Sequence, residues 1–185
     1  MPASGPCLAL YTFGMFATRA DDPVNDGFRD RNDPVLAAAE VFPGFIARSG
    51  YASDPGPEPW GKEVYPRFFT DEYRDGWAPA TLSLWRDLES AFAFIYFGIH
   101  AEAMSHGREW FRKPAWPPLV LWWHSDEGVP QWAEGVRRHH HLHDHGPTSE
   151  GFAFAVPFDA DGNSVRVDKG RIKALAAGAT FPHRG

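Results

Sequence analysis

The sequence has little cysteine, no long apolar run and no excess of positive charge, and each shortage excludes a class of protein. Its 185 residues include a single cysteine, Cys7. One cysteine cannot form an intramolecular disulfide or a cysteine-based zinc site, and it cannot supply a c-type haem attachment motif. We interpret Cys7 as a small apolar residue of the first strand.

The features of membrane and nucleic-acid proteins are also missing. The densest apolar run, Ala91 to Ile99, is far shorter than the about 18 residues that a spanning helix needs. The first residues show no basic region followed by an apolar stretch, so we expect no signal peptide. The formal net charge is −6 and there is no basic stripe, which argues against nucleic acid as a partner. We therefore expect a cytoplasmic protein without a membrane partner.

Aromatic residues, in contrast, are abundant. The chain has eight Trp and fifteen Phe, and so many large rings line either a core or a ligand cavity. The length favours one domain. We assign residues 1–162 to this domain and 163–185 to a C-terminal extension, with a short strand or helix followed by a loose tail.

The central stretch, residues 80–111, reads as a buried strand that leads into the longest helix. Leu82 and Leu84 should face one side of the strand and Trp85 the other. Asp87 stands where a helix N-cap belongs, and apolar residues at helical spacing follow it to the end of the stretch.

The rest of the chain offers further elements of both kinds. The segment 52–79 is rich in Pro, Gly and charge but also in aromatic rings, so we expect an ordered surface excursion that forms a lid. Asp33 and Pro34 mark the N-cap and first position of the stronger half of one predicted helix. We predict strands at 7–17, 45–51, 119–124 and 152–158, helices at 23–42 and 130–145, and a turn at 159–162.

The order of these elements predicts the fold class. Strand, helix, strand, strand, helix, strand is the split βαβ arrangement of an α+β, ferredoxin-like fold, with an antiparallel sheet and its helices on one face. The strands are apolar on both faces, so the second face must also be covered. A second copy of the chain is the simplest source of a covering sheet, and we therefore expect a homodimer.

Several segments resemble those of a bacterial family known as a domain of unknown function. These segments are ATLSLWRDLES, GIHAEAMSHGREWF, PPLVLWW, HLHDHGPTSEGFAF and PFDADG, and the likeness covers residues 8–162. The family's pattern has Arg at the position of Gly107 and lacks the triple histidine 139–141. At fold level the family resembles the dimeric α/β-barrel superfamily, which includes antibiotic-biosynthesis-type monooxygenases. The resemblance implies a dimeric barrel but does not select a reaction.

A pocket between the long helix and the sheet is the first candidate site. His100 would be the general base of a monooxygenase-like enzyme without an organic cofactor, acting on a small aromatic or hydrophobic molecule in a dry pocket. Tyr96 and His106 would assist it. The competing interpretation is an ordinary aromatic core. The residues expected to bind the substrate are Tyr11, Phe13, Trp85, Trp110 and Trp122.

The histidine-rich helix is the second candidate. His139 and His143, or His141 and His145, are four residues apart and could bind a metal in pairs, although crowded histidines more often form a solvated surface. Haem is the third possibility, because relatives of this fold hold iron through a helical histidine, and His100 or His143 would serve. The protein would then be a haem-dependent enzyme or a non-catalytic binding protein for haem or another hydrophobic ligand.

Overall fold

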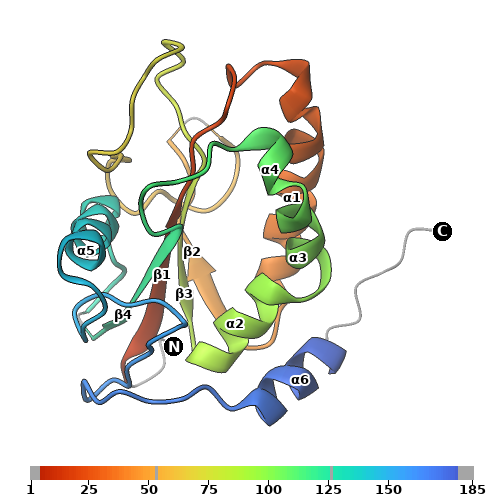
Figure 1. The fold of residues 1–185 in the computed structure, drawn as a ribbon. Helices are drawn as coiled ribbons and strands as arrows, with labels where there is room; N and C mark the ends of the chain where they lie inside the picture. Colours follow the sequence, from red (N-terminus) through yellow and green to blue (C-terminus); the bar gives the residue numbers. More distant parts are fainter. Residues whose placement is uncertain (1–4, 53, 126, 179–185) are drawn as a thin grey trace.

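A computed structural model describes residues 5–52, 54–125 and 127–178 and contains one four-stranded antiparallel sheet. The strand order is β2-β3-β1-β4, so the first and third strands are central. This confirms the α+β class, while the sheet of the described chain stays open and is not closed into a barrel (Figure 1). The strands are β1 (Cys7–Phe13), β2 (Phe45–Arg48), β3 (Ala80–Trp85) and β4 (Leu119–His124).

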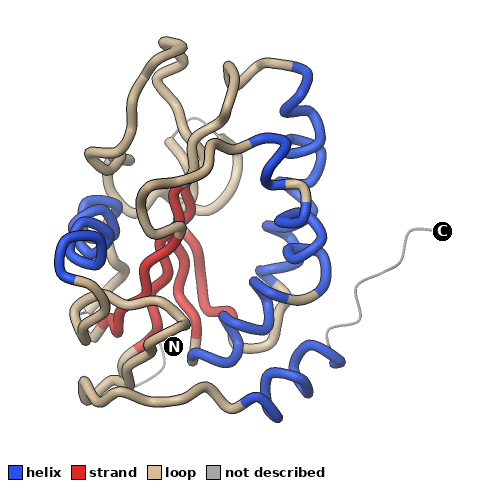
Figure 2. The backbone as a smooth tube through the Cα atoms, viewed as in Figure 1, coloured by secondary structure: helices blue, strands red, loops and turns tan. Residues whose placement is uncertain are grey.

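Helices lie on both sides of this sheet. Helices α1 to α4 lie on one side, and α5 lies on the other (Figures 1 and 2). The helices are η1 (Pro23–Asn25), α1 (Asp26–Glu40), α2 (Leu88–Tyr96), α3 (Gly98–Ser105), α4 (Gly107–Trp110), α5 (Trp132–His145) and α6 (Lys169–Gly178). Among the described residues, none of them combines the length and apolar character that crossing a membrane requires.

The junction between β3 and α2 forms as predicted. Leu82 and Leu84 belong to the core on the α5 side, whereas Trp85 packs on the opposite side. Asp87 caps α2, because its Oδ1 accepts a hydrogen bond from the Ser90 backbone N–H at 2.9 Å.

Replacing Asp87 with alanine should lower the free energy of unfolding by about 1 kcal/mol or more, since the N-cap bond is lost. The same side chain also forms an ion pair with Arg171 of α6. Asp87→Asn is the matched control, because asparagine caps helices equally well but cannot form the ion pair. Urea unfolding of both variants should show most of the loss in the alanine variant only. Equal losses would place the stabilisation in the ion pair instead.

The single long helix predicted from residue 88 to 111 is wrong, because the chain forms three helices there. Phe97 is extended (φ −133°, ψ 164°) and Gly98 has φ +62°, a conformation that glycine adopts without strain. His106 then ends α3 and Gly107 begins α4. The apolar spacing continues across the breaks, so periodicity alone did not reveal them.

Other predicted boundaries also move. Helix α1 begins at Asp26 and contains Pro34 in its interior, so Asp33 is not its N-cap. The residue that fixes the start of this region is Asp22, whose Oδ1 accepts from Val24 N at 2.9 Å in η1. Strands β1 and β2 are shorter than predicted, and 152–158 is not a strand, since only Phe152 bridges to β4.

The elements near the C-terminus follow the predictions more closely. Helix α5 starts two residues later than expected and ends at Gly146, whose φ is +75°. Asp159 forms the predicted turn by accepting from the backbone N–H groups of Asp161 and Asn163. Beyond it, α6 packs against α2 and buries Ile172 to 4% exposure, whereas the expected loose tail at 179–185 lies outside the described residues.

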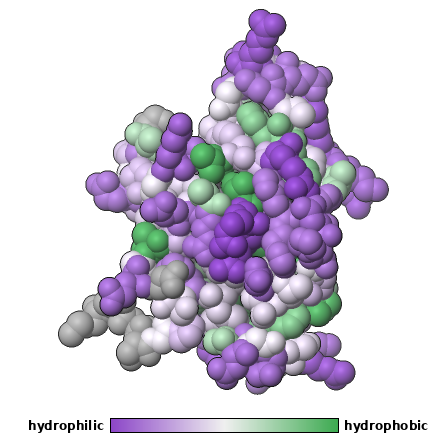
Figure 3. Space-filling view, turned by 90° about the vertical axis from the view of Figure 1, so that its left-hand side faces the viewer, coloured by the Kyte–Doolittle hydropathy of each residue, from purple (hydrophilic) through white to green (hydrophobic). Residues whose placement is uncertain are grey.

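The chain itself covers both faces of the sheet. One face packs against α1, α2 and α6, and the other packs against α5 and rings of segment 60–69. Figure 3 looks onto the α5 side, where hydrophilic side chains cover most of the surface and leave only small hydrophobic areas. The reason for expecting a second copy on this face therefore disappears, because α5 takes the place of the second sheet. The homodimer itself stays a prediction.

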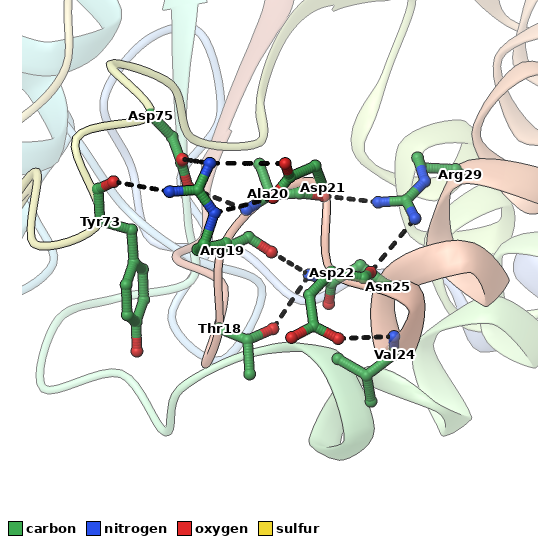
Figure 4. A network of polar contacts seen from close by, with 10 residues as sticks. All are labelled: Thr18, Arg19, Ala20, Asp21, Asp22, Val24, Asn25, Arg29, Tyr73 and Asp75. Atoms are coloured by element: carbon green, nitrogen blue, oxygen red, sulfur yellow. Dashed lines mark hydrogen bonds and ion pairs between the residues drawn. The ribbon is translucent and has the colours of Figure 1, made fainter.

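The excursion 52–79 forms no helix or strand in its described part, but both its ends are fastened. Near the start, Trp60 N donates to Ser49 Oγ at 2.9 Å. Near the end, Asp75 accepts from Ala20 N at 2.8 Å and pairs with Arg19, as Figure 4 shows. These bonds hold the excursion at both ends, and its role as an ordered lid stays a prediction.

Candidate functional site

The sheet separates the residues that we expected to line one pocket. Tyr11, Phe13 and Trp122 lie in the core on the α5 side. Trp85 lies on the opposite face, where Phe94 is 5.3 Å from it and His100 is in turn 5.3 Å from Phe94, between ring centroids. The predicted pocket therefore does not exist as one cavity, because the backbone of the sheet stands between its two halves.

His100 keeps a geometry suited to a base. It lies half-buried in the first turn of α3, and its Nδ1 is 2.9 Å from the carbonyl oxygen of Ile95. A carbonyl only accepts, so Nδ1 carries the proton and Nε2 keeps its lone pair. Burial lowers the pKa of the imidazole, which favours this neutral form at neutral pH.

Of the other predicted site residues on these helices, His106 and Tyr96 lie at the surface, whereas Trp110 does not. The Nε2 of His106 is 3.2 Å from Glu102 and its Nδ1 is 3.0 Å from Glu109. Tyr96 is 40% exposed. Trp110 is buried, and the ring of His106 stacks on it at 5.7 Å. Both nitrogens of His106 are thus engaged by carboxylates, so neither is free to act on a substrate.

The α5 side of the sheet holds a dense group of rings from four parts of the chain, which we name the aromatic cluster. His139 of α5 is at its centre, with ring centroids 5.7 Å from Tyr11 and 5.6 Å from Phe68. Trp132 packs against Tyr11 at 6.2 Å. The members of the aromatic cluster are Tyr11, Phe13, Phe68, Trp116, Trp122, Trp132 and His139.

Unpaired polar atoms are concentrated in this cluster. Eight buried side-chain nitrogen or oxygen atoms have no hydrogen-bond partner within the described part of the chain, and five of them belong to the aromatic cluster. Buried polar groups are normally paired, and leaving one unpaired costs about 1–3 kcal/mol. A concentration of them between apolar rings is therefore what a binding site for a planar, partly polar molecule would contain. The five atoms are Tyr11 Oη, Trp116 Nε1, Trp122 Nε1, Trp132 Nε1 and His139 Nδ1.

His139 is the member of the aromatic cluster whose ring can accept a proton. It is fully buried, and its Nε2 is 2.5 Å from the carbonyl oxygen of Pro117. The proton therefore lies on Nε2, and Nδ1 keeps a free lone pair. Burial lowers the pKa of this imidazole, so it is neutral at neutral pH. The sequence pattern suggested His139 only as a metal ligand and did not single it out as a base.

The histidine pairs have other partners in the structure. His143 is exposed and packs its ring on Phe68 at 4.7 Å, while His141 Nε2 is 2.8 Å from Thr148 Oγ1, and the ring of His145 lies 4.8 Å from that of His141. Within residues 5–52, 54–125 and 127–178, no three His, Cys, Asp or Glu side chains converge as a metal site requires. We therefore assign none of these histidines as a metal ligand.

The surface cavities of the described residues include two that do not adjoin the histidines proposed to bind haem. The larger, about 440 Å³, is an open groove at the start of α5, lined by His124, Gln131, Glu134 and Arg137 among others. The smaller, about 20 Å³, lies between the end of the excursion and Arg112. His100, His143 and the members of the aromatic cluster line neither of the two cavities, so the cavities identify no haem site, and we derive no step through haem.

Comparison with known protein families gives a match over most of the chain. Residues 7–168 match the model of a family described as a domain of unknown function, DUF3291. The chain belongs to the DUF3291 family. No curated protein and no solved structure matches the chain. The resemblance to a domain-of-unknown-function family is thereby confirmed.

The DUF3291 match includes the whole aromatic cluster and His100, but it ends before α6. The sheet, α5 and the excursion 52–79 are thus all parts of the family domain. Helix α6 lies outside the matched segment, although it packs on the α2 side of the same sheet.

Proposed function

We propose that this DUF3291 chain binds a small aromatic molecule in the aromatic cluster and acts on it as a monooxygenase-like enzyme without an organic cofactor. The observation that carries the proposal is the set of five buried, unpaired polar atoms among apolar rings. Four of these, three indole N–H groups and the hydroxyl of Tyr11, are donors, and His139 Nδ1 is an acceptor. A phenol or hydroxyketone has the complementary groups.

The arrangement of the sheet supports the fold on which the proposal is based. The strand order β2-β3-β1-β4, with α1 and α2 as connections on one face, supports a ferredoxin-like fold related to the dimeric α/β-barrel superfamily. Fold alone does not select a reaction, so the chemistry must come from the residues of the site.

His139 would act as the general base. Its Nδ1 would take a proton from an activated C–H of the substrate, leaving a carbanion. The electron pair of this carbanion forms a C–O bond with dioxygen, and the resulting peroxide takes a proton from the imidazolium. Loss of water then gives a ketone, so that a CH₂ group and O₂ become C=O and H₂O. Surrounding rings would keep other water away from the carbanion.

His100 is the second candidate for the base, because its free Nε2 favours the same role on the other face of the sheet. Oxygen uptake with hydroxyaryl ketones, measured in an oxygen electrode, separates the two. His139→Gln should lower the rate about 10²- to 10⁴-fold, the usual contribution of a general base, while His100→Gln should leave it nearly unchanged. The reverse pattern would move the base to His100.

Binding is tested separately from turnover. Calorimetric titration with 1-naphthol should show saturable binding, and Trp122→Phe should weaken it about fivefold, which corresponds to one lost hydrogen bond. Trp77→Phe is the control, since Trp77 is 41% exposed and lies outside the aromatic cluster. Binding without oxygen uptake would favour a non-catalytic binding protein, and absence of any aromatic ligand would reject the proposed site.

A further inference from the structure

Residues 61–69, which we name the lid segment, are held against α5 by contacts with its polar side. The backbone N–H of Arg67 lies 3.0 Å from His140 Nε2. The guanidinium of Arg67 forms a two-pronged ion pair with Asp144. The ring of Phe68 stacks on Trp116 at 5.5 Å and contacts His143 at 4.7 Å. These contacts tie the middle of the excursion to α5 and to Trp116.

The two ends of the excursion are held elsewhere. Trp60 is bonded to Ser49, and Asp75 is bonded to Ala20 and Arg19. Neither anchor involves His140 or Asp144, although the carbonyl oxygen of Trp60 also accepts from Trp132 N at the start of α5. The lid segment is therefore a strap between two fastened points, held closed by its bonds to α5 and by the packing of Tyr65 and Phe68 on the sheet side.

When closed, the lid segment covers the aromatic cluster. Phe68 contacts His139 at 5.6 Å, and Tyr65 contacts Phe13 at 6.3 Å. Burial by these rings contributes to the complete exclusion of His139 from solvent. Access to the base in the proposed function thus depends on the lid segment.

The bond between Arg67 and His140 constrains the charge of the imidazole. A backbone N–H is always a donor, so His140 Nε2 must accept and cannot carry a proton. Protonation would turn the contact into two N–H groups facing each other at 3.0 Å, which is repulsive. From this geometry we propose that His140 is a pH-sensitive latch, closing the lid segment when neutral and releasing it when protonated.

The charged groups around His140 set the direction of the switch. Arg67 of the lid segment and His143 of α5 oppose its protonation, whereas Asp144 favours it, and His139 lies beside it on the same helix. Partial burial and Arg67 together lower the pKa of His140, so it stays neutral near pH 7. Arg67 also lowers the pKa of Asp144, so the carboxylate and its ion pair persist in mild acid. Mild acid therefore removes the His140 bond and leaves the ion pair between Arg67 and Asp144 in place.

Hydrogen exchange of single amides, measured by NMR without any ligand, tests the latch. Between pH 7.5 and pH 5.0, the protection factor of the Arg67 amide should fall at least about fivefold, the factor for one hydrogen bond, with smaller losses at Phe68 and Phe69. In His140→Gln the side-chain carbonyl accepts at every pH, so protection should stay constant. His145→Gln is the matched control, because His145 lies on the same helix against His141, and it should behave as the wild type.

The possible results distinguish a failure of the latch from a failure of the proposed binding site. Unchanged protection in the wild type, or an equal loss in His140→Gln, would overturn the latch. His140→Asn serves as a second acceptor variant if the glutamine variant does not fold. The inference rests on the proposed function only for what the lid segment covers. If protection falls as expected but 1-naphthol binds at neither pH, the latch stands and the proposed function fails.

Discussion

Replacing Trp132 with alanine is expected to lower the free energy of unfolding by about 3–5 kcal/mol, the range for a large aromatic lost from a core. Trp132 is fully buried and joins α5 to the sheet through Tyr11 at 6.2 Å and Tyr51 at 5.8 Å. Its neighbours cannot close the gap, because α5 already approaches the sheet as near as its backbone permits. At Gly135 an added Cβ would lie 2.9 Å from the ring of Tyr11.

Two further variants make this measurement specific. Trp132→Phe keeps a ring and removes the unpaired Nε1, so it should lose less than half as much stability as the alanine variant. Trp77→Ala is the control for an exposed tryptophan. Urea unfolding followed by circular dichroism gives all three values. A loss below about 1 kcal/mol for Trp132→Ala would mean that α5 contributes little to the core, contrary to its burial.

Lowering the pH from 7 to 5 is expected to destabilise the protein through its buried histidines. Burial lowers the pKa of His139 in the folded state, so the unfolded chain binds its proton more readily. Stability is then complete above the unfolded pKa of about 6.5 and is lost as the pH falls below it. One such group contributes about 1.4 kcal/mol per pH unit, or up to about 2 kcal/mol between pH 6.5 and 5. The pKa values of His100 and His140 shift in the same direction.

The matched variant for the pH series is His139→Gln, which retains a side-chain N–H for the Pro117 carbonyl but does not titrate. Its unfolding free energy should depend less on pH than that of the wild type. The carboxylates with lowered pKa values, such as Asp144 and Glu102, affect the unfolding free energy in a more acidic range. The change between pH 7 and pH 5 therefore comes from the histidines. Parallel curves for the two proteins would show that His139 is not the titrating group.

The sequence predicted local features of the backbone better than contacts between residues distant in the chain. Short-range hydrogen bonds explain the correct predictions. Asp87 caps α2, Gly146 ends α5 and Asp159 forms its turn, because each residue acts on backbone groups within four positions of itself. The strand alternation of Leu82 and Trp85 was correct for the same reason, since neighbouring side chains in a strand must point to opposite faces. The break at Gly98 was missed because apolar spacing continued across it.

The sequence by itself determined the α+β class and the order of the elements from β1 to β4, apart from the two breaks in the predicted long helix. Only the tertiary structure decided which rings share a face. Tyr11 and Trp122 meet α5, while Trp85 meets α2 and His100 lies beyond Phe94. Such contacts join residues distant in the chain, and their partners depend on strand register and on the path of the lid segment, which no local pattern encodes. For this physical reason the sequence favoured His100 as the base, whereas the proposed function uses His139.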